Sequence, residues 1–151
     1  MQKSGKDYNQ VAKTLQGVLG SIDPDCLAFL QSGGENLQDY VSALLANSLL
    51  AVGSFAANLA AFTGTGGTNL APGAAAIVVN TGGAFFNSGW VVDQGAIQGG
   101  TAEAGVFILL HELGHALSAS GFQPDLNNTK AGRSNDQLIN QHCQKTLSAF
   151  Q

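Results

Sequence analysis

The chain has 151 residues, which is enough for one domain with a hydrophobic core of its own. Charged residues make up only 11% of the chain and glycine is frequent, with 20 residues, a composition typical of a packed, loop-rich extracellular domain and unlike that of a disordered chain. The net charge of −4 and the thin spread of Lys and Arg give no basic footprint, so we expect neither nucleic acid nor an anionic membrane surface as a partner.

The first third of the chain predicts two short helices. The segment 7–19 carries apolar residues at helical spacing and is followed by a glycine stop. Asp23 and Pro24 form the start of a second helix, with Asp23 as the N-cap and Pro24 in the first turn. Gly33 and Gly34 are expected to end it.

The longest apolar pattern lies at residues 41–62, which carry no charge. Large apolar side chains recur there every three or four residues after Asn36, an expected N-cap, so the pattern predicts a core helix with a break near Gly53. A membrane span is the alternative for an uncharged stretch of this length. Asn47 and Ser54 belong to a polar side of the stretch, which favours the core helix.

A loop and two strands are expected next. Residues 63–74 are rich in Gly and Thr without periodicity, which predicts a loop. The segments 74–80 and 84–92 are β-branched or aromatic and predict a hairpin or two sheet strands. Gly82 and Gly83 between them either allow a close approach of another backbone or serve as turn residues.

The segment 106–118 carries the chemistry of the chain, because His111, Glu112 and His115 form an H-E-x-x-H sequence. On a helix the two histidines lie one turn apart on one face, so their imidazoles can converge on a single ion. An ordinary pair of partly buried histidines is the alternative, but the complete motif rarely arises by chance in a chain of this length. The motif therefore predicts a zinc site.

Zinc held by three protein groups keeps its fourth position for water and lowers the pKa of that water to about 7. Glu112 would lie beside the metal and take the proton as hydroxide attacks a carbonyl, which is the chemistry of peptide hydrolysis. Gly114 costs about 1 kcal/mol of helix propensity relative to Ala, so its presence suggests a close neighbour beside the metal. Thr101 is the expected N-cap of this helix, which should run to about Ser120.

The sequence LLHELGHAL resembles the active-site helix of the zincin metallopeptidases. This resemblance implies an α+β fold in which the helix lies beneath a small twisted sheet and an extended substrate binds along the edge strand. The metzincin extension is absent, because Ser118 stands in place of its glycine and Gly121 in place of its third ligand. A Cys-x-x-Phe-Leu segment, Gly-Ala-Phe-Phe, the motif helix and a late Cys are together similar to small uncharacterised secreted or toxin-associated bacterial zincins.

A catalytic zinc site needs a third protein ligand downstream of the two histidines. We favour Asp125, whose distance from His115 is similar to that in the aspzincins, although the aspzincin G-T-x-x-D sequence is absent. Asp136 and His142 are the alternatives. His142 is chemically suited to zinc, but a solvated or core histidine is the more common role of such a residue.

The polar group that would polarise the substrate carbonyl is not decided by the sequence. Tyr8 and Tyr40 are far upstream, which leaves Arg133, Asn127 and Asn135 as candidates if the downstream loop folds over the zinc. Ser134 and Gln137 match a capping box and predict a last helix over 136–150.

Cys26 and Cys143 lie near opposite ends of the chain and outside any Cys-x-x-Cys spacing. They predict a long-range disulfide, worth about 4–5 kcal/mol in the chain-entropy model, and the alternative is two buried thiols in a reducing cytosol. The polar N-terminal segment shows no signal peptide, so we expect the mature form of a secreted or periplasmic protein.

These observations predict a single zincin-like domain over residues 1–151, with N-terminal helices, a small sheet, the H-E-x-x-H helix and a C-terminal helix. The expected function is a zinc peptidase that hydrolyses peptide or protein substrates, with Glu112 as the general base and His111, His115 and Asp125 as metal ligands. Two alternatives remain open. One is a non-catalytic module stabilised by a closed zinc site, for instance with Asp125 and His142 both bound, and the other is a toxin or effector domain with a specific protein target.

Overall fold

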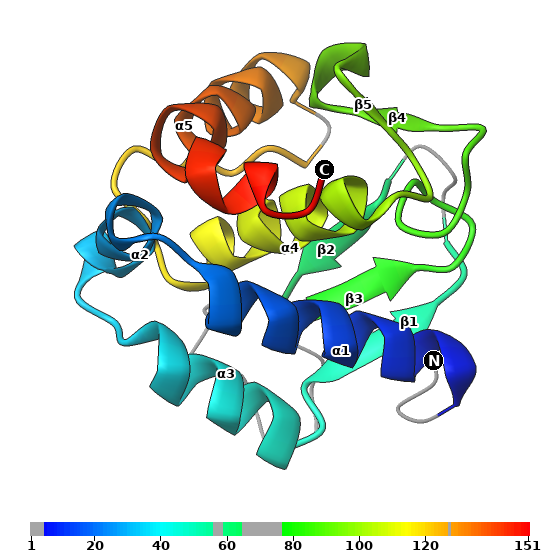
Figure 1. The fold of residues 1–151 in the computed structure, drawn as a ribbon, viewed down its shortest axis with the longest axis horizontal. Helices are drawn as coiled ribbons and strands as arrows, with labels where there is room; N and C mark the ends of the chain where they lie inside the picture. Colours follow the sequence, from blue (N-terminus) through cyan, green and yellow to red (C-terminus); the bar gives the residue numbers. More distant parts are fainter. Residues whose placement is uncertain (1–4, 56–58, 65–76, 127) are drawn as a thin grey trace.

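The computed structural model describes residues 5–55, 59–64, 77–126 and 128–151, and Figure 1 shows their arrangement. The larger helices and the sheet strands are α1 (Lys6–Ser21), α2 (Pro24–Leu30), α3 (Leu37–Ala46), β1 (Leu50–Gly53), β2 (Ala61–Thr63), β3 (Ile77–Asn80), α4 (Ala102–Ala116) and α5 (Thr129–Ser148). A short hairpin, β4 (Val91–Val92) and β5 (Ile97–Gln98), and two 3-10 turns, η1 (Gln31–Gly33) and η3 (Asp93–Gly95), complete the set. The fold is a mixture of helices and small sheets, which agrees with the predicted α+β class at that level.

The larger sheet has the strand order β1-β3-β2. Central β3 pairs in parallel with β1, where Val52 lies opposite Val79, and antiparallel with β2, where Ala61 lies opposite Val79. All four residues of β3 are buried, as expected for a central strand covered on both faces. In this strand order β2 is an outer strand among the residues that the structure describes.

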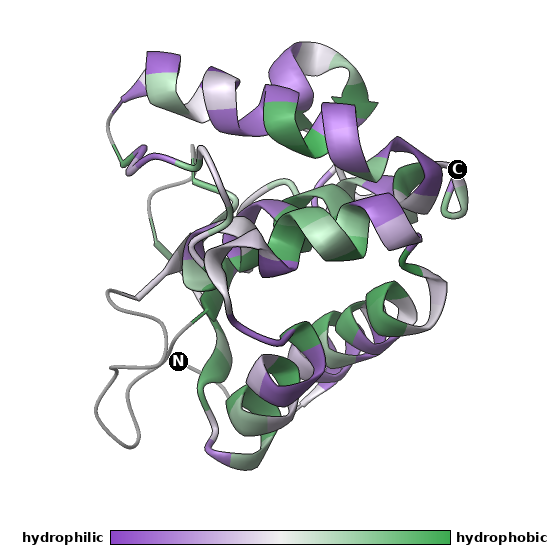
Figure 2. Ribbon diagram, turned by 90° about the vertical axis from the view of Figure 1, so that its left-hand side faces the viewer, coloured by the Kyte–Doolittle hydropathy of each residue, from purple (hydrophilic) through white to green (hydrophobic). Residues whose placement is uncertain are grey.

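Helix α4 lies at the centre of the molecule, where it packs against α1, α5 and β2 (Figure 1). It is largely hydrophobic, whereas α5 is largely hydrophilic (Figure 2). Apolar side chains of α4 and of its C-cap are buried, among them Val106, Leu109, Leu110, Leu113, Ala116 and Leu117. The helix is buried on nearly all sides from residue 104 onward, and His111 and His115 are its partly exposed residues there.

Three predicted helix starts are confirmed by side-chain capping bonds. The carboxylate of Asp23 accepts hydrogen bonds from the backbone N–H groups of Asp25 and Cys26 at the start of α2. The side chain of Asn36 accepts from a backbone N–H in the first turn of α3, and that of Thr101 does so in α4. Each cap satisfies backbone donors that have no partner within the helix.

The helix predicted over 41–62, with a break near Gly53, is wrong beyond residue 46. Helix α3 ends at Ala46, Ser48 adopts a left-handed φ of 56°, and the chain continues as β1 and later β2. Leu50, Ala51 and Val52 are fully buried, and a short apolar run buried on both faces cannot be distinguished from a helix by periodicity alone. Within the described ranges, no helix is both long enough and apolar enough to cross a membrane.

The second predicted strand, 84–92, is also wrong over most of its length. Residues 84–86 lie in turns, and only 91–92 form a strand, in the β4–β5 hairpin. A Cβ at Gly83 would lie 2.8 Å from the carbonyl oxygen of Leu59, so this glycine does permit a close backbone approach. Residues 65–74 of the predicted loop and 74–76 of the predicted strand lie outside the described residues.

The boundaries of the two C-terminal helices differ from the prediction. Helix α4 ends at Ala116 rather than near 120, because Ser118 adopts a left-handed φ of 53°. Helix α5 begins at Thr129, seven positions earlier than the predicted 136, because the Asn128 side chain caps it by accepting from the N–H of Ala131. The capping box at 134 is therefore inside the helix.

Helix α5 is joined to the N-terminal half by the predicted disulfide between Cys26 and Cys143, which are 117 residues apart. Beside it, the Asp23 carboxylate accepts hydrogen bonds from the backbone N–H and the hydroxyl of Thr146. Helices α2 and α5 pack against each other at this junction. The end of α5 is thus fixed to the start of α2 by covalent and polar contacts.

Candidate metal centre

His111, His115 and Asp125 come together and are the described residues that could hold a metal ion as a group. His111 Nε2 lies 2.7 Å from Asp125 Oδ2 and 3.2 Å from His115 Nε2, and His115 Nε2 lies 3.1 Å from Asp125 Oδ2. The three side chains are 15%, 18% and 20% exposed, so the group is accessible from the surface but mostly shielded from water. The residue that sequence spacing favoured is the one that joins the histidines.

The spacing of this triangle allows it to hold a metal ion. In a tetrahedral site with bonds of about 2.0–2.1 Å, neighbouring ligand atoms lie about 3.3 Å apart. The three donor atoms have separations of 2.7, 3.1 and 3.2 Å, all shorter than that value, so they would have to move apart slightly around such an ion. Two imidazoles and one carboxylate are also a donor set that zinc commonly uses in catalytic sites.

Asp136 lies on the other side of His111. The Nδ1–H of His111 donates a hydrogen bond to Asp136 Oδ1 at 2.8 Å. If an ion were bound at Nε2, this contact would keep the remaining ring proton on Nδ1 and orient the imidazole, as is typical of metal-binding histidines. Asp136, weighed above as a third ligand, therefore lies behind His111 rather than in the donor triangle.

The carboxylates around His111 change its protonation. Burial alone would lower the pKa of His111, but the hydrogen bonds to Asp125 and Asp136 and the charge of Glu112 raise it to about 10. For Asp125 the effects have the opposite sign. Burial alone would raise its pKa, but hydrogen bonds from His111, His115 and Asn135 hold the pKa of this carboxyl well below its usual value. A metal ion at this place competes with a proton on His111, as is usual for histidine ligands.

Glu112 lies on the motif helix, 7% exposed, and faces strand β2. The Thr63 hydroxyl at the end of β2 lies 2.8 Å from Glu112 Oε1. Burial raises the pKa of the Glu112 carboxyl above its usual value, although the charge of His111 and the Thr63 hydrogen bond act in the opposite direction. A raised pKa makes a carboxylate a stronger proton acceptor.

Gly114 has the close neighbour that its position suggested. A Cβ at residue 114 would overlap the ring of Phe122. That ring stands edge-on to both histidines, with centroid distances of 5.6 Å to His111 and 5.1 Å to His115. Phe122 thus packs beside the imidazoles, a role that its place in an irregular loop did not indicate.

His142 is not brought into the group. Its ring stacks on Phe29 at a centroid distance of 4.4 Å, and its Nδ1 lies 3.3 Å from Asp25 Oδ1. These contacts place it at the junction of α2 and α5. It fits the role of a partly buried structural histidine beside the disulfide.

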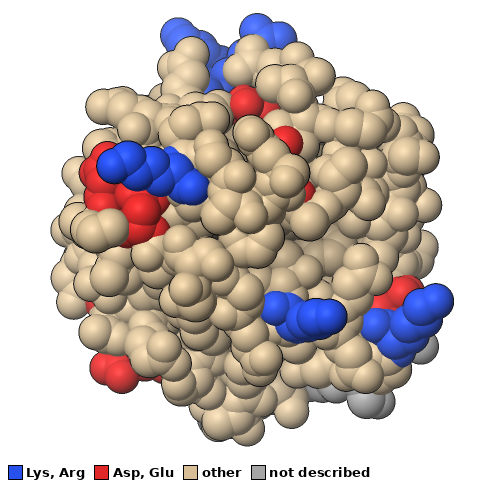
Figure 3. All heavy atoms as spheres, in the orientation of Figure 1, with Lys and Arg blue, Asp and Glu red and all other residues tan. Residues whose placement is uncertain are grey.

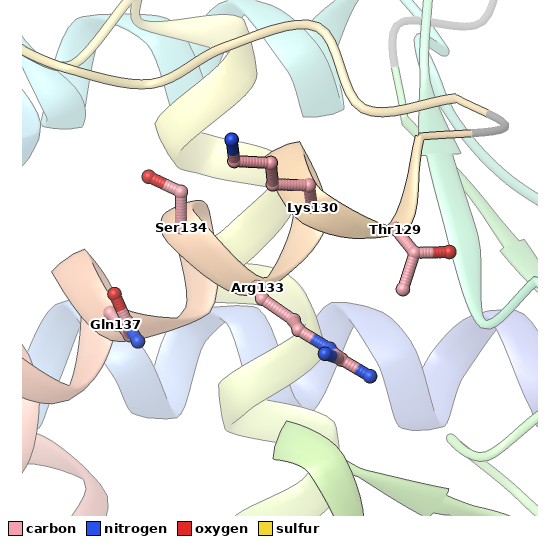
Figure 4. A pocket seen from close by; sticks show the side chains of 5 residues that line it. All are labelled: Thr129, Lys130, Arg133, Ser134 and Gln137. Atoms are coloured by element: carbon pink, nitrogen blue, oxygen red, sulfur yellow. The ribbon is translucent and has the colours of Figure 1, made fainter.

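The candidates for carbonyl polarisation have different positions. Asn127 lies outside the described residues. Arg133 lines a hollow on α5 together with Thr129, Lys130, Ser134 and Gln137 (Figure 4). Asn135 is fully buried and hydrogen-bonded to the loop that carries Asp125, so its amide is not available to a substrate.

Tyr40 is closer to the motif helix than its early position in the chain suggested. Its hydroxyl is buried and has no hydrogen-bond partner among the described residues. Burial, together with the charges of Glu35 and Glu112, raises the pKa of this tyrosine. The three-dimensional packing of α3 brings it near Glu112, which no local pattern could indicate.

The surface shows Lys and Arg side chains at separate points on the face in view, with no continuous basic patch there (Figure 3). No protein-family model, no curated protein and no solved structure matches the chain.

Proposed function

We propose that the protein is a zinc-dependent peptidase of the zincin type, with His111, His115 and Asp125 as metal ligands and Glu112 as the general base. The observation that carries the proposal is the convergence of His111 Nε2, His115 Nε2 and Asp125 Oδ2 next to a buried glutamate on the same helix. Aspartate completes a three-ligand set, which leaves one position of a tetrahedral ion open for catalysis.

Each residue has a defined role in this proposal. When bound, zinc supplies Lewis acidity toward a carbonyl and lowers the pKa of a water molecule. Glu112 accepts the proton from the attacking water and returns it to the leaving amine. Thr63 orients the Glu112 carboxylate, and Asp136 orients the His111 ring.

Strand β2 is the proposed place for an extended substrate. It is an outer strand of the sheet, it packs against α4, and its Thr63 contacts Glu112. A peptide that pairs with the outer edge of β2 would pass close to the general base, and such pairing binds the backbone of many sequences. A peptide or protein is therefore the proposed substrate class.

A secreted or periplasmic location is part of the proposal. The disulfide between Cys26 and Cys143 supports it, because such bonds persist in oxidising compartments and are rare in the cytosol.

The proposal is tested by metal analysis and peptide cleavage on protein made in an oxidising compartment. We expect close to one equivalent of zinc per chain, and cleavage of a mixed peptide library that a chelator stops and added zinc restores. The Glu112→Gln variant should keep its zinc but lose about 100- to 10,000-fold in turnover, because a general base contributes that much.

The Glu103→Gln variant is the matched control, since Glu103 lies on the same helix in its first turn. It should retain both zinc and activity. Absence of zinc after zinc-replete purification would refute the metal site. Full zinc occupancy without cleavage, and with no exchangeable water on the metal, would instead favour the structural module.

A further inference from the structure

We propose that Asn135 is a positioning residue that fixes Asp125 and its loop so that the third donor atom meets the two histidines. This inference rests on the proposed function, because it concerns the same metal site. Nothing in the H-E-x-x-H motif calls for an asparagine here. The inference follows from the contacts of one buried side chain on α5.

Asn135 connects α5 to the segment that carries Asp125. Its Oδ1 accepts a hydrogen bond from the backbone N–H of Gln123 at 2.9 Å, and its Nδ2 donates to the backbone carbonyl of Gln123 at 2.8 Å. The same Nδ2 donates to Asp125 Oδ2 at 3.0 Å. The amide thus holds both the main chain two residues before the ligand and the ligand oxygen itself.

The orientation of the amide is determined by these contacts. A side-chain amide has two N–H donors, and both are used, on Gln123 and on Asp125. A flipped amide would place its NH2 group against the N–H of Gln123 and its oxygen against the carboxylate of Asp125, so three favourable contacts would become repulsive. Asn135 is fully buried, so water does not compensate for a lost contact.

The contact with Asp125 leaves that carboxylate able to bind an ion. A carboxylate oxygen can accept more than one hydrogen bond or metal contact. Asn135 approaches Oδ2 from α5, whereas His111 Nε2 and His115 Nε2 lie 2.7 and 3.1 Å from the same oxygen. The amide therefore fixes the rotation of the Asp125 carboxylate, with Oδ2 toward the histidines.

The neighbouring residue acts on another ligand. Asp136, next in sequence, accepts the hydrogen bond from His111 Nδ1–H. Consecutive residues of α5 thus hold two of the three ligands, one on the motif helix and one on the loop. Asn135 is the uncharged member of this pair, and its hydrogen bonds go to Gln123 and Asp125.

The test is a double-mutant cycle on zinc affinity, measured by competition with a chromogenic chelator. Asn135→Leu removes the hydrogen bonds while keeping a branched side chain with the same number of heavy atoms. It should weaken zinc binding about 10- to 100-fold in the otherwise unchanged protein, the usual cost of losing a group that orients a ligand. In the Asp125→Ala background the same substitution should have no further effect, because Asn135 acts through Asp125.

The control and the second readout separate positioning from general stability. Thr146→Val, at the far end of α5, removes buried polar contacts of the same helix and should leave zinc affinity unchanged. The visible spectrum of the cobalt-substituted protein should change in Asn135→Leu as it does in Asp125→Ala, and stay unchanged in Thr146→Val. Circular dichroism checks folding, and Asn135→Ala replaces Asn135→Leu if the latter does not fold.

An equal loss of affinity from Asn135→Leu in both backgrounds, or no loss in either, would overturn the inference while leaving the zinc site intact. Failure of the unchanged protein to bind zinc would overturn the proposed function first, and the inference with it. The two failures are therefore distinguishable in one set of titrations.

Discussion

The hydroxyl of Thr63 lies 2.8 Å from Oε1 of Glu112 and 3.1 Å from the carbonyl oxygen of the same residue. Thr63 is the last residue of β2, so this contact joins an outer strand of the sheet to the motif helix. A buried carboxyl that loses a hydrogen-bond donor is poorly oriented and poorly solvated.

We expect Thr63→Val to lower turnover about 10- to 100-fold, the equivalent of one hydrogen bond to a charged group, without loss of zinc. Thr63→Ser keeps the hydroxyl and should retain most of the activity. Steady-state kinetics on one cleaved peptide, with zinc content measured in parallel, checks this. Equal turnover in the Val and Ser variants would show that the contact has no catalytic role.

Alanine substitutions at Asp125, Asp136 and His142 should weaken zinc binding to different extents, most at Asp125 and least at His142. Asp125→Ala removes a donor atom and should weaken zinc binding by several kcal/mol. Asp136→Ala removes only the group that orients His111 and should cost about 10- to 100-fold in affinity. His142→Ala should have no effect, since His142 pairs with Asp25 and stacks on Phe29.

Chelator competition under one set of conditions gives all three affinities. A larger loss for His142→Ala than for Asp125→Ala would reverse the ligand assignment.

Gly114 and Phe122 should be coupled in stability. Alanine at 114 favours the helix by about 1 kcal/mol, but its Cβ overlaps the Phe122 ring, and overpacking costs about 1–3 kcal/mol. We therefore expect Gly114→Ala to destabilise the protein, and to stabilise it when Phe122→Ala is also present. Denaturant unfolding of the two single variants and the double variant measures this, and a stabilising Gly114→Ala in the unchanged background would contradict it.

The junction of α2 and α5 should contribute a pH-dependent part of stability. Burial raises the pKa of Asp23, but hydrogen bonds from the Thr146 hydroxyl and from the backbone N–H groups of Cys26, Thr146 and Asp25 outweigh that effect and lower the pKa below the usual value of 3.8. Because the folded-state pKa is the lower one, the stabilisation is fully present above the unfolded pKa and is lost as the pH falls through the folded value.

Asp23→Ala should lower the free energy of unfolding by about 0.5–2 kcal/mol at pH 7, the usual contribution of an N-cap. The loss should become smaller as the pH falls below 3.8. The free energy of unfolding of both proteins between pH 2 and pH 7 tests this. A difference that does not change across that range would show that the charge of Asp23 plays no part. Asp23→Asn is the control, because it keeps an acceptor for the cap without the charge.

The disulfide should be present and stabilising. Protein from an oxidising compartment should have the mass of a chain lacking the two thiol hydrogens of Cys26 and Cys143. Replacing both cysteines by Ala should lower the free energy of unfolding by up to about 5 kcal/mol, the chain-entropy value for a loop of 117 residues. Complete alkylation of the native protein by a thiol reagent would argue against the bond.

The parts of the fold that were predictable from sequence are those with local chemical signatures. Asp23, Asn36 and Thr101 were identified as N-caps because capping depends on a side chain and the next three backbone N–H groups. The approach of Asp125 to the histidines was also anticipated, since a short return from the motif helix limits where that carboxylate can lie. Its metal role stays a prediction.

The parts that were not predictable depend on partners far apart in sequence. Strand β1 is buried on both faces, so its apolar residues satisfied a helical pattern equally well. Asn135 was considered only as a substrate contact, because its hydrogen bonds to Gln123 and Asp125 arise from the packing of α5 on a loop. The Phe122 ring occupies space that a side chain at position 114 would fill. The sequence indicated a close neighbour for Gly114 but not which residue it is.

The bond between Cys26 and Cys143 encloses the whole sheet, the motif helix and the loop of Asp125 in one covalent ring. A single backbone cut anywhere inside that ring, whether by a separate protease or by the proposed activity of a second copy of this chain, leaves both fragments attached to each other. Such nicked molecules would migrate as one species until a reductant is added. Self-cleavage therefore has to be looked for on reducing gels.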